Sequence, residues 1–348
     1  MLSSISSAKE TIYFAGYCFA PGRLFNEFEE KLIAAAKRGV LTYVLADYHG
    51  SSKITQSTIN RLVKHGVIWV FYRPLNLQNA IKYDLRLHKK LLIVDNKIGF
   101  TGGLGIYDVW IKSVDKYPLS WQDTHFKIEG PVVDEMQKSF IESWNKFSPA
   151  EYMLAFNPEA SKDSGDIAIS SINSPPAIKT SKVGNLYLDM IDCAQESIYI
   201  TTAYFGPTKN LRNALINAAK RGVKVSLILN GKYNTHTFAA EAGRRWYKHL
   251  IEAGVDIFEY QPTKIHSKLL TIDGKYTSIG SGNMNFRSFH SDAEHNLLIK
   301  DRGISHQIVN EFNINLKHCH KISMQDINDV GILREIYRFI FSLPRILY

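Results

Sequence analysis

Two kinds of hydrophobic pattern alternate along this chain. Short segments rich in β-branched and aromatic residues are typical of strands, and longer segments repeat apolar residues every three or four positions, as on one face of a helix. The strand-like segments are 11–17, 40–46, 197–204 and 223–229, and the helix-like segments are 25–37 and 211–220. Strands that alternate with helices predict an α/β fold with mixed, mostly parallel sheets flanked by helices.

The second half of the chain repeats the first. The sequence Ala-Ala-Lys-Arg-Gly-Val occurs at 35–40 and again at 218–223, and a Leu-Gly-Val pattern that ends at Pro74 returns in a segment that ends at Pro262. A repeat of domain size predicts two similar lobes with a pseudo-symmetric site between them, rather than a solenoid. The predicted organisation is a first lobe at 1–156, a polar linker at 157–166, a second lobe at 167–330 and a basic amphipathic segment at 331–348.

One chemical motif occurs once in each predicted lobe. It has the form His-x-Lys-x4-Asp, and its residues are His88, Lys90 and Asp95 in the first half and His266, Lys268 and Asp273 in the second. We expect the motifs on strands at 87–94 and 265–272, where residues two apart share a face, so each His and Lys should point the same way. The aspartates have the opposite parity and stand at hairpin-like turns. We expect them to hold structure, although all six residues are kept in the candidate catalytic set.

These residue types suit chemistry on a phosphodiester. An imidazole can attack phosphorus or transfer a proton near neutral pH, so two histidines brought together could divide the nucleophile and acid/base roles without a metal. The two lysines would stabilise negative charge on the phosphate oxygens. The candidate phosphate-binding residues that follow the motifs are Gly103, Ser281 and Asn283. The alternative for any single one of these residues is a structural or solvated side chain. Aromatic residues near the motifs could line a pocket or belong to the core: Tyr17, Phe19, Tyr107, Trp110, Trp121, Tyr204 and Phe205.

The two motifs resemble those of the phospholipase D superfamily, and several other segments resemble its bacterial cardiolipin synthase branch. Those segments are 44–51, 121–131, 204–207, 283–288 and 294–299. The resemblance implies two phospholipase D-like lobes with the active site between them and a covalent phosphohistidine intermediate. By this analogy His88 is the nucleophile and His266 the acid/base group. It also implies that a carboxylate downstream of each motif orients a histidine ring, and the matching positions are Asp123 and Glu294. The alternative is that these are two surface acids.

The chain departs from the pattern of this branch in two places. The first motif ends Gly102-Gly103-Leu104-Gly105, where the branch usually has asparagine at the last position, so one side-chain amide for phosphate is missing. The chain also begins almost at its first strand, without the membrane-spanning segment of many cardiolipin synthases. We therefore expect membrane contact through the amphipathic segment 331–348. The alternative is a terminal helix docked on its own domain.

Composition limits the classes of protein. The chain has 348 residues, 45% of them hydrophobic, which indicates a folded globular protein. It has neither an apolar run long enough to span a membrane nor a secretory signal, so we expect a cytoplasmic protein, peripheral on the inner face of the cell membrane. The three cysteines lack the spacing of zinc or redox sites, and we expect no metal or other cofactor.

Charge and motifs together lead to a predicted function. The formal net charge of +9 suits a partner rich in phosphate, either anionic phospholipid or nucleic acid. We predict a monomeric phosphatidyltransferase, without an obligate protein partner, that makes cardiolipin from phosphatidylglycerol through a phosphohistidine. One alternative is a phospholipase D-type hydrolase, and another is a nuclease, which the basic clusters Lys89-Lys90 and Arg244-Arg245 favour. A third is an inactive membrane-binding scaffold.

Overall fold

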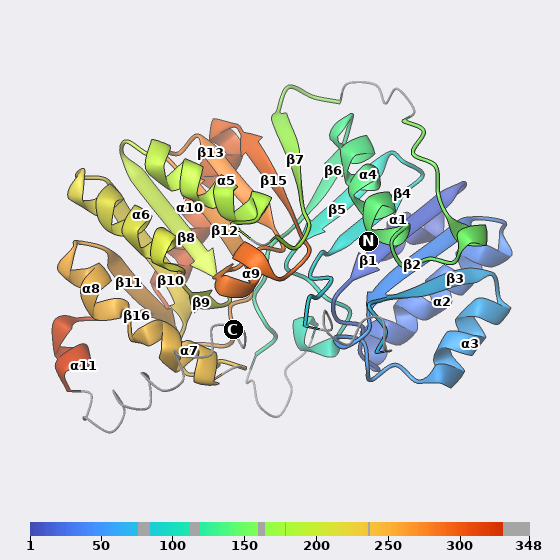
Figure 1. Ribbon diagram of the computed structural model, residues 1–348, viewed down its shortest axis with the longest axis horizontal. Helices are drawn as coiled ribbons and strands as arrows, with labels where there is room; N and C mark the ends of the chain where they lie inside the picture. The colour runs from blue at the N-terminus through green and yellow to red at the C-terminus, as the bar shows by residue number, and fades with distance from the viewer. Residues whose placement is uncertain (76–83, 112–118, 159–163, 178, 236, 330–348) are drawn as a thin grey trace.

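The fold places two mixed β-sheets side by side, with helices on their faces (Figure 1). The computed structural model describes residues 1–75, 84–111, 119–158, 164–177, 179–235 and 237–329. Within them strands alternate with helices in both halves, which confirms the predicted α/β class with two similar lobes. The sheets are mixed as predicted, but the expectation that they are mostly parallel was wrong, because antiparallel pairings extend each parallel set of three strands and outnumber the parallel ones.

The first sheet has six strands in the order β3-β2-β1-β4-β5-β6. Its parallel strands are β1 (Thr11–Gly16), β2 (Leu41–Asp47) and β3 (Val67–Tyr72), which are connected through α2 (Arg23–Lys37) and α3 (Gln56–Lys64). Its antiparallel extension is formed by β4 (Leu91–Val94), β5 (Ile98–Gly102) and β6 (His125–Glu129). The first half also contains α1 (Leu2–Ser7), a 3₁₀ turn at Asp108–Trp110, α4 (Val132–Trp144) and a second 3₁₀ turn at Ala150–Tyr152.

The second sheet has eight strands in the order β16-β11-β10-β8-β12-β13-β15-β7, and its central six repeat the arrangement of the first sheet. The parallel strands are β8 (Ser197–Thr202), β10 (Lys224–Asn230) and β11 (Asp256–Tyr260). The antiparallel ones are β12 (Lys268–Ile272), β13 (Tyr276–Gly280), β15 (Glu294–Lys300), β7 (Ala168–Ser174) and β16 (Cys319–Lys321).

The helices of the second half are α5 (Lys182–Cys193), α6 (Lys209–Lys220), α7 (Thr237–Arg244), α8 (Tyr247–Glu252), α9 (Phe286–His290), α10 (Arg302–Leu316) and α11 (Met324–Asn328). A small separate pairing joins β9 (Phe205–Gly206) to β14 (Met284–Asn285). Several of these helices begin at a residue whose side chain caps the first turn, such as Thr208 before α6 and Asp301 before α10.

The repeated Ala-Ala-Lys-Arg-Gly-Val sequence ends a helix and leads into a strand in both halves. Gly39 after α2 and Gly222 after α6 have φ angles of 91° and 88°, in the left-handed region that favours glycine. Val40 and Val223 follow and are buried. The repeat in the sequence is therefore a repeated helix ending that turns the chain back into the sheet.

The two sheets share part of their hydrophobic core. One cluster of buried side chains joins Leu45, Phe140 and Trp144 of the first half to Leu269 and Leu297 of the second. The lobes are thus held against each other by apolar packing, which fixes the distance between the two motifs.

The predicted boundary at 157–166 lies between the last helix of the first half and β7, which belongs to the second sheet. Residues 159–163 of this linker lie outside the described residues, and we keep the division into 1–156 and 167–330 as a proposal. The amphipathic segment predicted at 331–348 also lies outside them. In the part of the chain that the structure describes, no helix has both the length and the apolar character needed to span a bilayer.

Both motifs begin before their strands rather than on them. The strand predicted at 87–94 starts only at Leu91, and the strand predicted at 265–272 starts only at Lys268. The reason is that the residues just before β4 and β12 pair with the opposite lobe instead of with their own sheet.

Candidate active site

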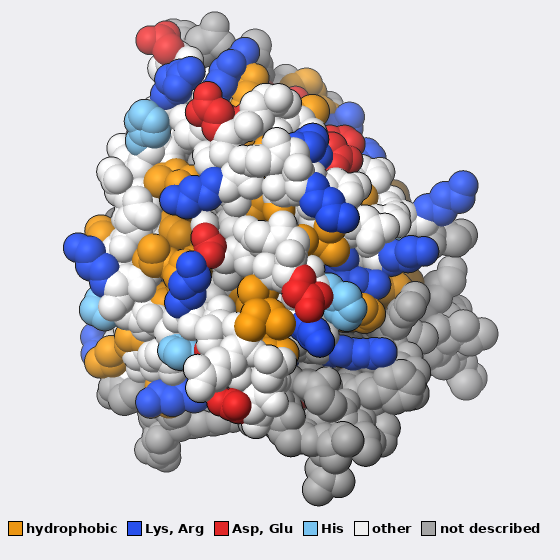
Figure 2. Space-filling model, turned by 90° about the vertical axis from the view of Figure 1, so that its left-hand side faces the viewer, with side chains coloured by type: hydrophobic (Ala, Val, Ile, Leu, Met, Phe, Trp, Pro, Cys, Tyr) orange, Lys and Arg blue, Asp and Glu red, His pale blue; other side chains and the backbone are white. Residues whose placement is uncertain are grey.

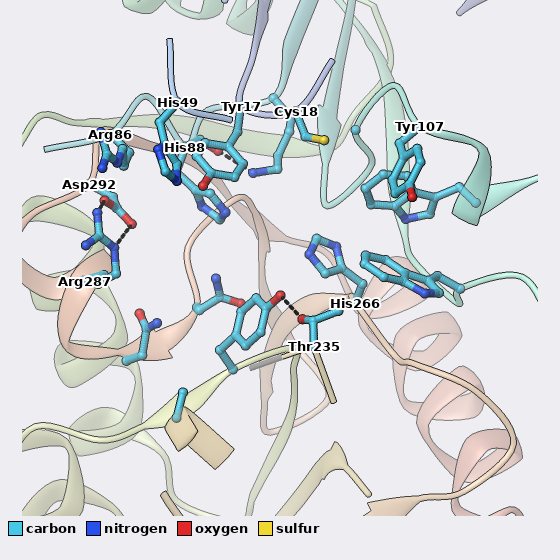
Figure 3. Close-up of a pocket in the computed structure, with 18 of the residues that line it drawn as sticks. Tyr17, Cys18, His49, Arg86, His88, Tyr107, Thr235, His266, Arg287 and Asp292 are labelled. Carbon is cyan, nitrogen blue, oxygen red and sulfur yellow. Dashed lines mark hydrogen bonds and ion pairs between the residues drawn. The ribbon is translucent and has the colours of Figure 1, made fainter. Parts of the chain in front are cut away.

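A cavity of about 380 Å³ lies between the two lobes, and both motif histidines line it (Figure 3). On the side of His88 the lining is charged and polar: His49, Arg86, Arg287 and Asp292. On the side of His266 it is aromatic: Tyr107, Trp110, Trp121 and Tyr204. Both lobes contribute to each side, so neither lobe alone forms the cavity.

His88 is held by the second lobe. Leu87 forms a β-bridge with Ala293, and the His88 backbone N–H donates to the Ala293 carbonyl at 2.9 Å. This brings the His88 Nδ1 atom to 2.9 and 3.0 Å from the two carboxylate oxygens of Glu294. Because a carboxylate only accepts, Nδ1 carries the proton, and Nε2 is left with its lone pair for reaction.

His266 is held by the first lobe in the corresponding way. Ile265 forms a β-bridge with Gln122, and the His266 backbone N–H donates to the Gln122 carbonyl at 2.6 Å. The His266 Nδ1 atom lies 2.8 Å from Oδ2 of Asp123. The two carboxylates that the resemblance implies are therefore histidine partners, and the pairing crosses between the lobes.

Each carboxylate also accepts hydrogen bonds that fix its position. Glu294 accepts from the hydroxyl groups of Ser281 and Ser288, the latter at 2.6 Å. Asp123 accepts from the backbone N–H of Thr124 at 2.8 Å and from the indole N–H of Trp110 at 3.0 Å. A buried carboxylate that is satisfied in this way can hold an imidazole in one tautomer.

The charge state of the site follows from burial and from these contacts. Burial alone would raise the pKa of Glu294, but His88, Lys90 and Ser281 outweigh it and lower that pKa to about 2. Burial lowers the pKa of both histidines, most strongly that of His266, where Lys268 adds to the effect. The carboxylate of the His88–Glu294 pair is therefore ionised, and burial favours the neutral form of both imidazoles.

The two motif lysines lie beside the two histidines. Lys90 lines the cavity and donates to the His88 carbonyl at 2.7 Å, and burial lowers its pKa to about 8. The Nζ of Lys268 lies 2.9 Å from Nδ1 of His266, and burial lowers the Lys268 pKa to about 7. Lys90 is thus placed to meet a bound anion, whereas Lys268 lies against the histidine ring.

The two motif aspartates lie away from this cavity. Asp95 accepts hydrogen bonds from the backbone N–H groups of Lys9, Glu10 and Thr11, and Asp273 accepts from those of Gln195, Glu196 and Ser197. Each follows its strand at the end opposite to the histidine, and its φ angle of 51° or 52° forms a tight turn. These contacts favour the structural role expected for Asp95 and Asp273 over a catalytic one, because each carboxylate is engaged by backbone N–H groups away from the cavity.

The three candidate phosphate-binding residues have different positions. Asn283 lines the cavity, and among the described residues its buried Oδ1 has no hydrogen-bond partner. Gly103 does not line the cavity, and its backbone N–H donates to the Thr124 carbonyl at 3.2 Å. Ser281 directs its hydroxyl to Glu294. Of these three residues only Asn283 lines the cavity, so its position suits phosphate binding, whereas the positions of Gly103 and Ser281 do not favour that role.

The aromatic residues noted in the sequence divide between the cavity and the core. Five of them line the cavity: Tyr17, Tyr107, Trp110, Trp121 and Tyr204. Phe19 and Phe205 are buried in hydrophobic clusters, 2% and 8% exposed. The cavity is therefore amphipathic, as a site for a lipid headgroup with its adjoining glycerol would be.

The structural role of the residue between the histidine and the lysine of each motif was not predicted from the sequence; this residue is Lys89 in the first motif and Ser267 in the second. Lys89 is 1% exposed, and its ammonium donates to Oδ1 of Asn173, on the β7 edge strand of the second lobe, at 2.6 Å. Ser267 contacts the Thr124 hydroxyl of the first lobe at 3.1 Å. Both lie behind their histidines and link the two lobes. The strand parity that places His and Lys together also places the residue between them on the opposite face, and this was the available signal.

The basic clusters that favoured a nuclease are not exposed. Lys89 is buried, and Arg244 forms ion pairs with Glu241 and Glu259 at 2.8 and 2.7 Å. On the face of the second lobe drawn in Figure 2, Lys and Arg side chains are scattered among acidic and apolar ones rather than gathered in one patch. These residues therefore give no support to a nucleic-acid surface.

One group of side chains in the described part of the chain has the spacing of a metal site. It consists of His88, Asp292 and Glu294, whose ligand atoms lie within 4.8 Å of one another. Glu294 is hydrogen-bonded to His88, and Asp292 forms an ion pair with Arg287 at 2.7 Å. The group is accounted for by these contacts, and we assign no metal to it.

Comparison with solved structures identifies the same fold elsewhere. The phosphatidylserine synthase of Haemophilus influenzae Rd KW20 matches 98% of this chain and 89% of its own chain with a TM-score of 0.75. The sequence identity is 16%, so this likeness concerns the fold.

Comparison of sequences gives the family. The model for the cardiolipin synthase, phospholipase D-like domain matches residues 1–144 and 187–315. The chain is 31% identical over 349 aligned positions to a cardiolipin synthase of Oceanobacillus iheyensis, covering 100% of this chain and 71% of that protein. It is 30% identical over 334 positions to the major cardiolipin synthase of Bacillus subtilis (strain 168), covering 94% and 68%. The chain therefore belongs to the bacterial cardiolipin synthase branch of the phospholipase D superfamily.

Proposed function

We propose that this protein is a phosphatidyltransferase that makes cardiolipin from phosphatidylglycerol. One observation carries the proposal: two histidines line the same cavity, and each is held by a carboxylate of the opposite lobe. Such a pair suits a two-step transfer, because one ring must bond to phosphorus while the other moves a proton. The relatives named cardiolipin synthase support the choice of substrate.

In the first step Nε2 of His88 attacks the phosphorus of one phosphatidylglycerol. The bond between phosphorus and the glycerol oxygen breaks, and His266 gives its proton to that oxygen, so free glycerol leaves. Lys90 and the Asn283 side chain lie on the cavity wall, where they would stabilise the negative charge on the phosphate oxygens. The product is a phosphatidyl group bonded to His88.

In the second step a hydroxyl of a second phosphatidylglycerol attacks the same phosphorus. Its proton passes to the neutral His266, the bond between phosphorus and nitrogen breaks, and His88 returns to its starting form. Cardiolipin is the product, and the proton that His266 takes up replaces the one it gave to glycerol. Two phosphatidylglycerol molecules have then given one cardiolipin and one glycerol.

The proton on His266 requires the substrate to be bound. Burial and the neighbouring Lys268 lower the pKa of His266 in the empty site. An anionic phosphodiester places negative charge beside the ring and raises that pKa again. Binding of the phosphodiester thus favours the protonated form of His266, which is the acid that the first step requires.

We also propose that the protein works on a lipid surface at the inner face of the cell membrane, as a monomer. Ile111 and Leu119 are 45% and 55% exposed, and Trp110 and Trp121, one and two positions away from them along the chain, line the cavity. Exposed aliphatic side chains beside a cavity suit contact with a bilayer. A monomer is sufficient because one chain supplies both motifs and both carboxylates.

A product assay with purified protein and phosphatidylglycerol vesicles tests the function. Mass spectrometry should detect cardiolipin and glycerol, and both should be lost in His88→Ala and His266→Ala. Phosphatidic acid alone would indicate a hydrolase. Intact lipid together with cut nucleic acid would indicate a nuclease, and vesicle binding without turnover, unchanged in His88→Ala, would indicate a scaffold.

A second experiment assigns the two histidines. A phosphodiester with a nitrophenol leaving group needs no acid, so His266→Ala should still form the covalent intermediate and then stall. Peptide mapping should find the phosphoryl group on His88, and His88→Ala should not be labelled. A label on His266 in the His88→Ala variant would reverse the two roles.

A further inference from the structure

Position 105 is occupied by glycine, where the second half of the site has Asn283. A Cβ atom on Gly105 would lie 3.0 and 3.1 Å from Cη2 and Cζ3 of Trp110, and 3.2 Å from the carbonyl oxygen of Cys18. These distances are shorter than ordinary van der Waals contact, and an asparagine would have to extend further. Any side chain at this position therefore requires the Trp110 ring or the Cys18 carbonyl to shift by a few tenths of an ångström.

Trp110 contacts both members of the Asp123–His266 pair. Its indole N–H donates to Oδ2 of Asp123 at 3.0 Å, and the same oxygen lies 2.8 Å from Nδ1 of His266. The Trp110 ring centroid lies 5.4 Å from that of His266, with an angle of 76° between the planes. One side chain thus orients the carboxylate and packs edge to face on the imidazole.

In the other half of the site the carboxylate is oriented by a hydroxyl group. Glu294 accepts a hydrogen bond from Ser281. The matching residue of the first half is Gly103, which has no side chain, and a Cβ there would lie 2.1 Å from Oδ1 of Asp123. Asp123 therefore has no donor from the matching position, and besides the backbone N–H of Thr124 it accepts a hydrogen bond from the indole of Trp110.

We infer that Trp110 is a positioning residue for His266, acting through Asp123, and that glycine at position 105 is what makes room for it. The inference rests on the proposed function in one respect, namely that His266 transfers the proton. The two halves of the site have thus become specialised: the second supplies the amide for phosphate, and the first supplies the aromatic donor.

A double-mutant cycle on positions 105 and 110 tests this inference. Trp110→Phe removes the N–H and the outer ring atoms, and it should lower kcat about tenfold with KM changed less than about twofold. Gly105→Asn should lower kcat/KM by about tenfold or more where Trp110 is present, but by less than about threefold in the Trp110→Phe background. Equal effects in both backgrounds, or a gain of activity in Gly105→Asn, would overturn the inference.

The pH profile separates positioning from a loss of packing. Without the indole donor the Asp123 carboxylate binds its proton more tightly, so the acid limb of kcat should move to higher pH in Trp110→Phe. The other titratable groups around the pair are Lys264, Lys268 and Glu311 of the second lobe and His88, Lys90 and His125 of the first, and the variant changes none of them. Trp121→Phe is the matched control, since its ring also lies against His266, 5.5 Å away, and it should leave that limb in place. An acid limb that is unmoved in Trp110→Phe would refute the positioning role.

Two readouts do not depend on turnover, so the inference and the proposed function can fail separately. In an NMR titration the chemical shifts of the His266 ring report its pKa. The midpoint of this titration should lie at higher pH in Trp110→Phe than in the parent protein, and it should be unchanged in Trp121→Phe. Gly105→Asn should lower the melting temperature more in the parent protein than in the Trp110→Phe background. If the parent protein makes no cardiolipin but these shifts occur, the function fails and the inference stands. If cardiolipin is made but the shifts are missing, the inference fails.

Discussion

Nδ1 of His88 lies 2.9 Å from the carboxylate of Glu294, although the two residues are 206 positions apart in the sequence. Glu294→Gln keeps the shape of the side chain but removes its charge and one acceptor, so His88 loses its fixed tautomer. We expect kcat to fall by roughly 10²–10⁴-fold. Steady-state kinetics on phosphatidylglycerol vesicles measures this fall.

Glu259→Gln is the control for Glu294→Gln. Glu259 is also a buried acid paired with a cation, but its partner is Arg244, away from the cavity. Its replacement should reduce stability and leave kcat within about twofold. If both variants lost activity equally, the effect of Glu294→Gln would reflect general damage to the fold.

Asp95→Asn should reduce stability without slowing the chemistry. The carboxylate accepts three backbone N–H groups, and an amide can replace only part of this acceptor capacity. Asparagine tolerates the left-handed φ of this turn, so the backbone itself is not strained. We expect the free energy of unfolding to fall by about 1–3 kcal/mol in a denaturant titration, with kcat of the folded protein unchanged. Asp273→Asn should behave alike, and a large drop in kcat at either position would contradict the structural role.

Lys89→Met should loosen the junction between the lobes. The ammonium donates to Ser139, Ser143 and Asn173, and methionine leaves these buried oxygens without a donor. The free energy of unfolding should fall by about 2–4 kcal/mol. Lys97→Met, at a lysine whose side chain is 66% exposed, should change it by less than about 0.5 kcal/mol. Equal stability of the two variants would mean that Lys89 does not join the lobes.

The basic limb of the pH profile should report Lys90. Burial lowers the pKa of Lys90 to about 8, so the free enzyme loses this positive charge as the pH rises through 8. We expect kcat/KM to fall about tenfold per pH unit above that point. A bound anionic phosphate stabilises the ammonium, so the corresponding limb of kcat should lie at higher pH.

Lys90→Arg isolates the group responsible for this limb. The guanidinium stays charged over the whole range, so the limb near pH 8 should vanish even if the absolute rate is lower. A limb that persists unchanged in Lys90→Arg would have to come from another residue.

The sequence was sufficient to predict the elements because their signals are local. The apolar spacing at 25–37 and 211–220 corresponds to α2 (Arg23–Lys37) and α6 (Lys209–Lys220), whose apolar faces are buried. The duplicated motifs indicated both histidines, and the resemblance to the phospholipase D superfamily implied Asp123 and Glu294. The parity of Asp95 gave its structural role, although the motif as a whole had suggested a catalytic one.

The sequence could not predict the crossing of the histidine pairs. In a duplicated chain each carboxylate has two equivalent choices, the histidine of its own half or that of the other, and the pattern is the same for both. The choice is made by Leu87 and Ile265, which leave their own sheets to bridge the opposite lobe. For the same reason the strands begin later than the sequence predicts. The sequence also did not predict that Ser281 lies beside Glu294.

The crossed pairing has a consequence for how the enzyme becomes active during its synthesis. The ribosome completes the first lobe while Glu294 has not yet been made, and domains generally fold as they emerge. A nascent or prematurely terminated chain that ends before residue 266 contains His88 without its orienting carboxylate and Asp123 without its imidazole, and it lacks the second-lobe side chains that complete the shared core. We therefore expect phosphodiester chemistry only after translation has delivered the strand that begins at Glu294.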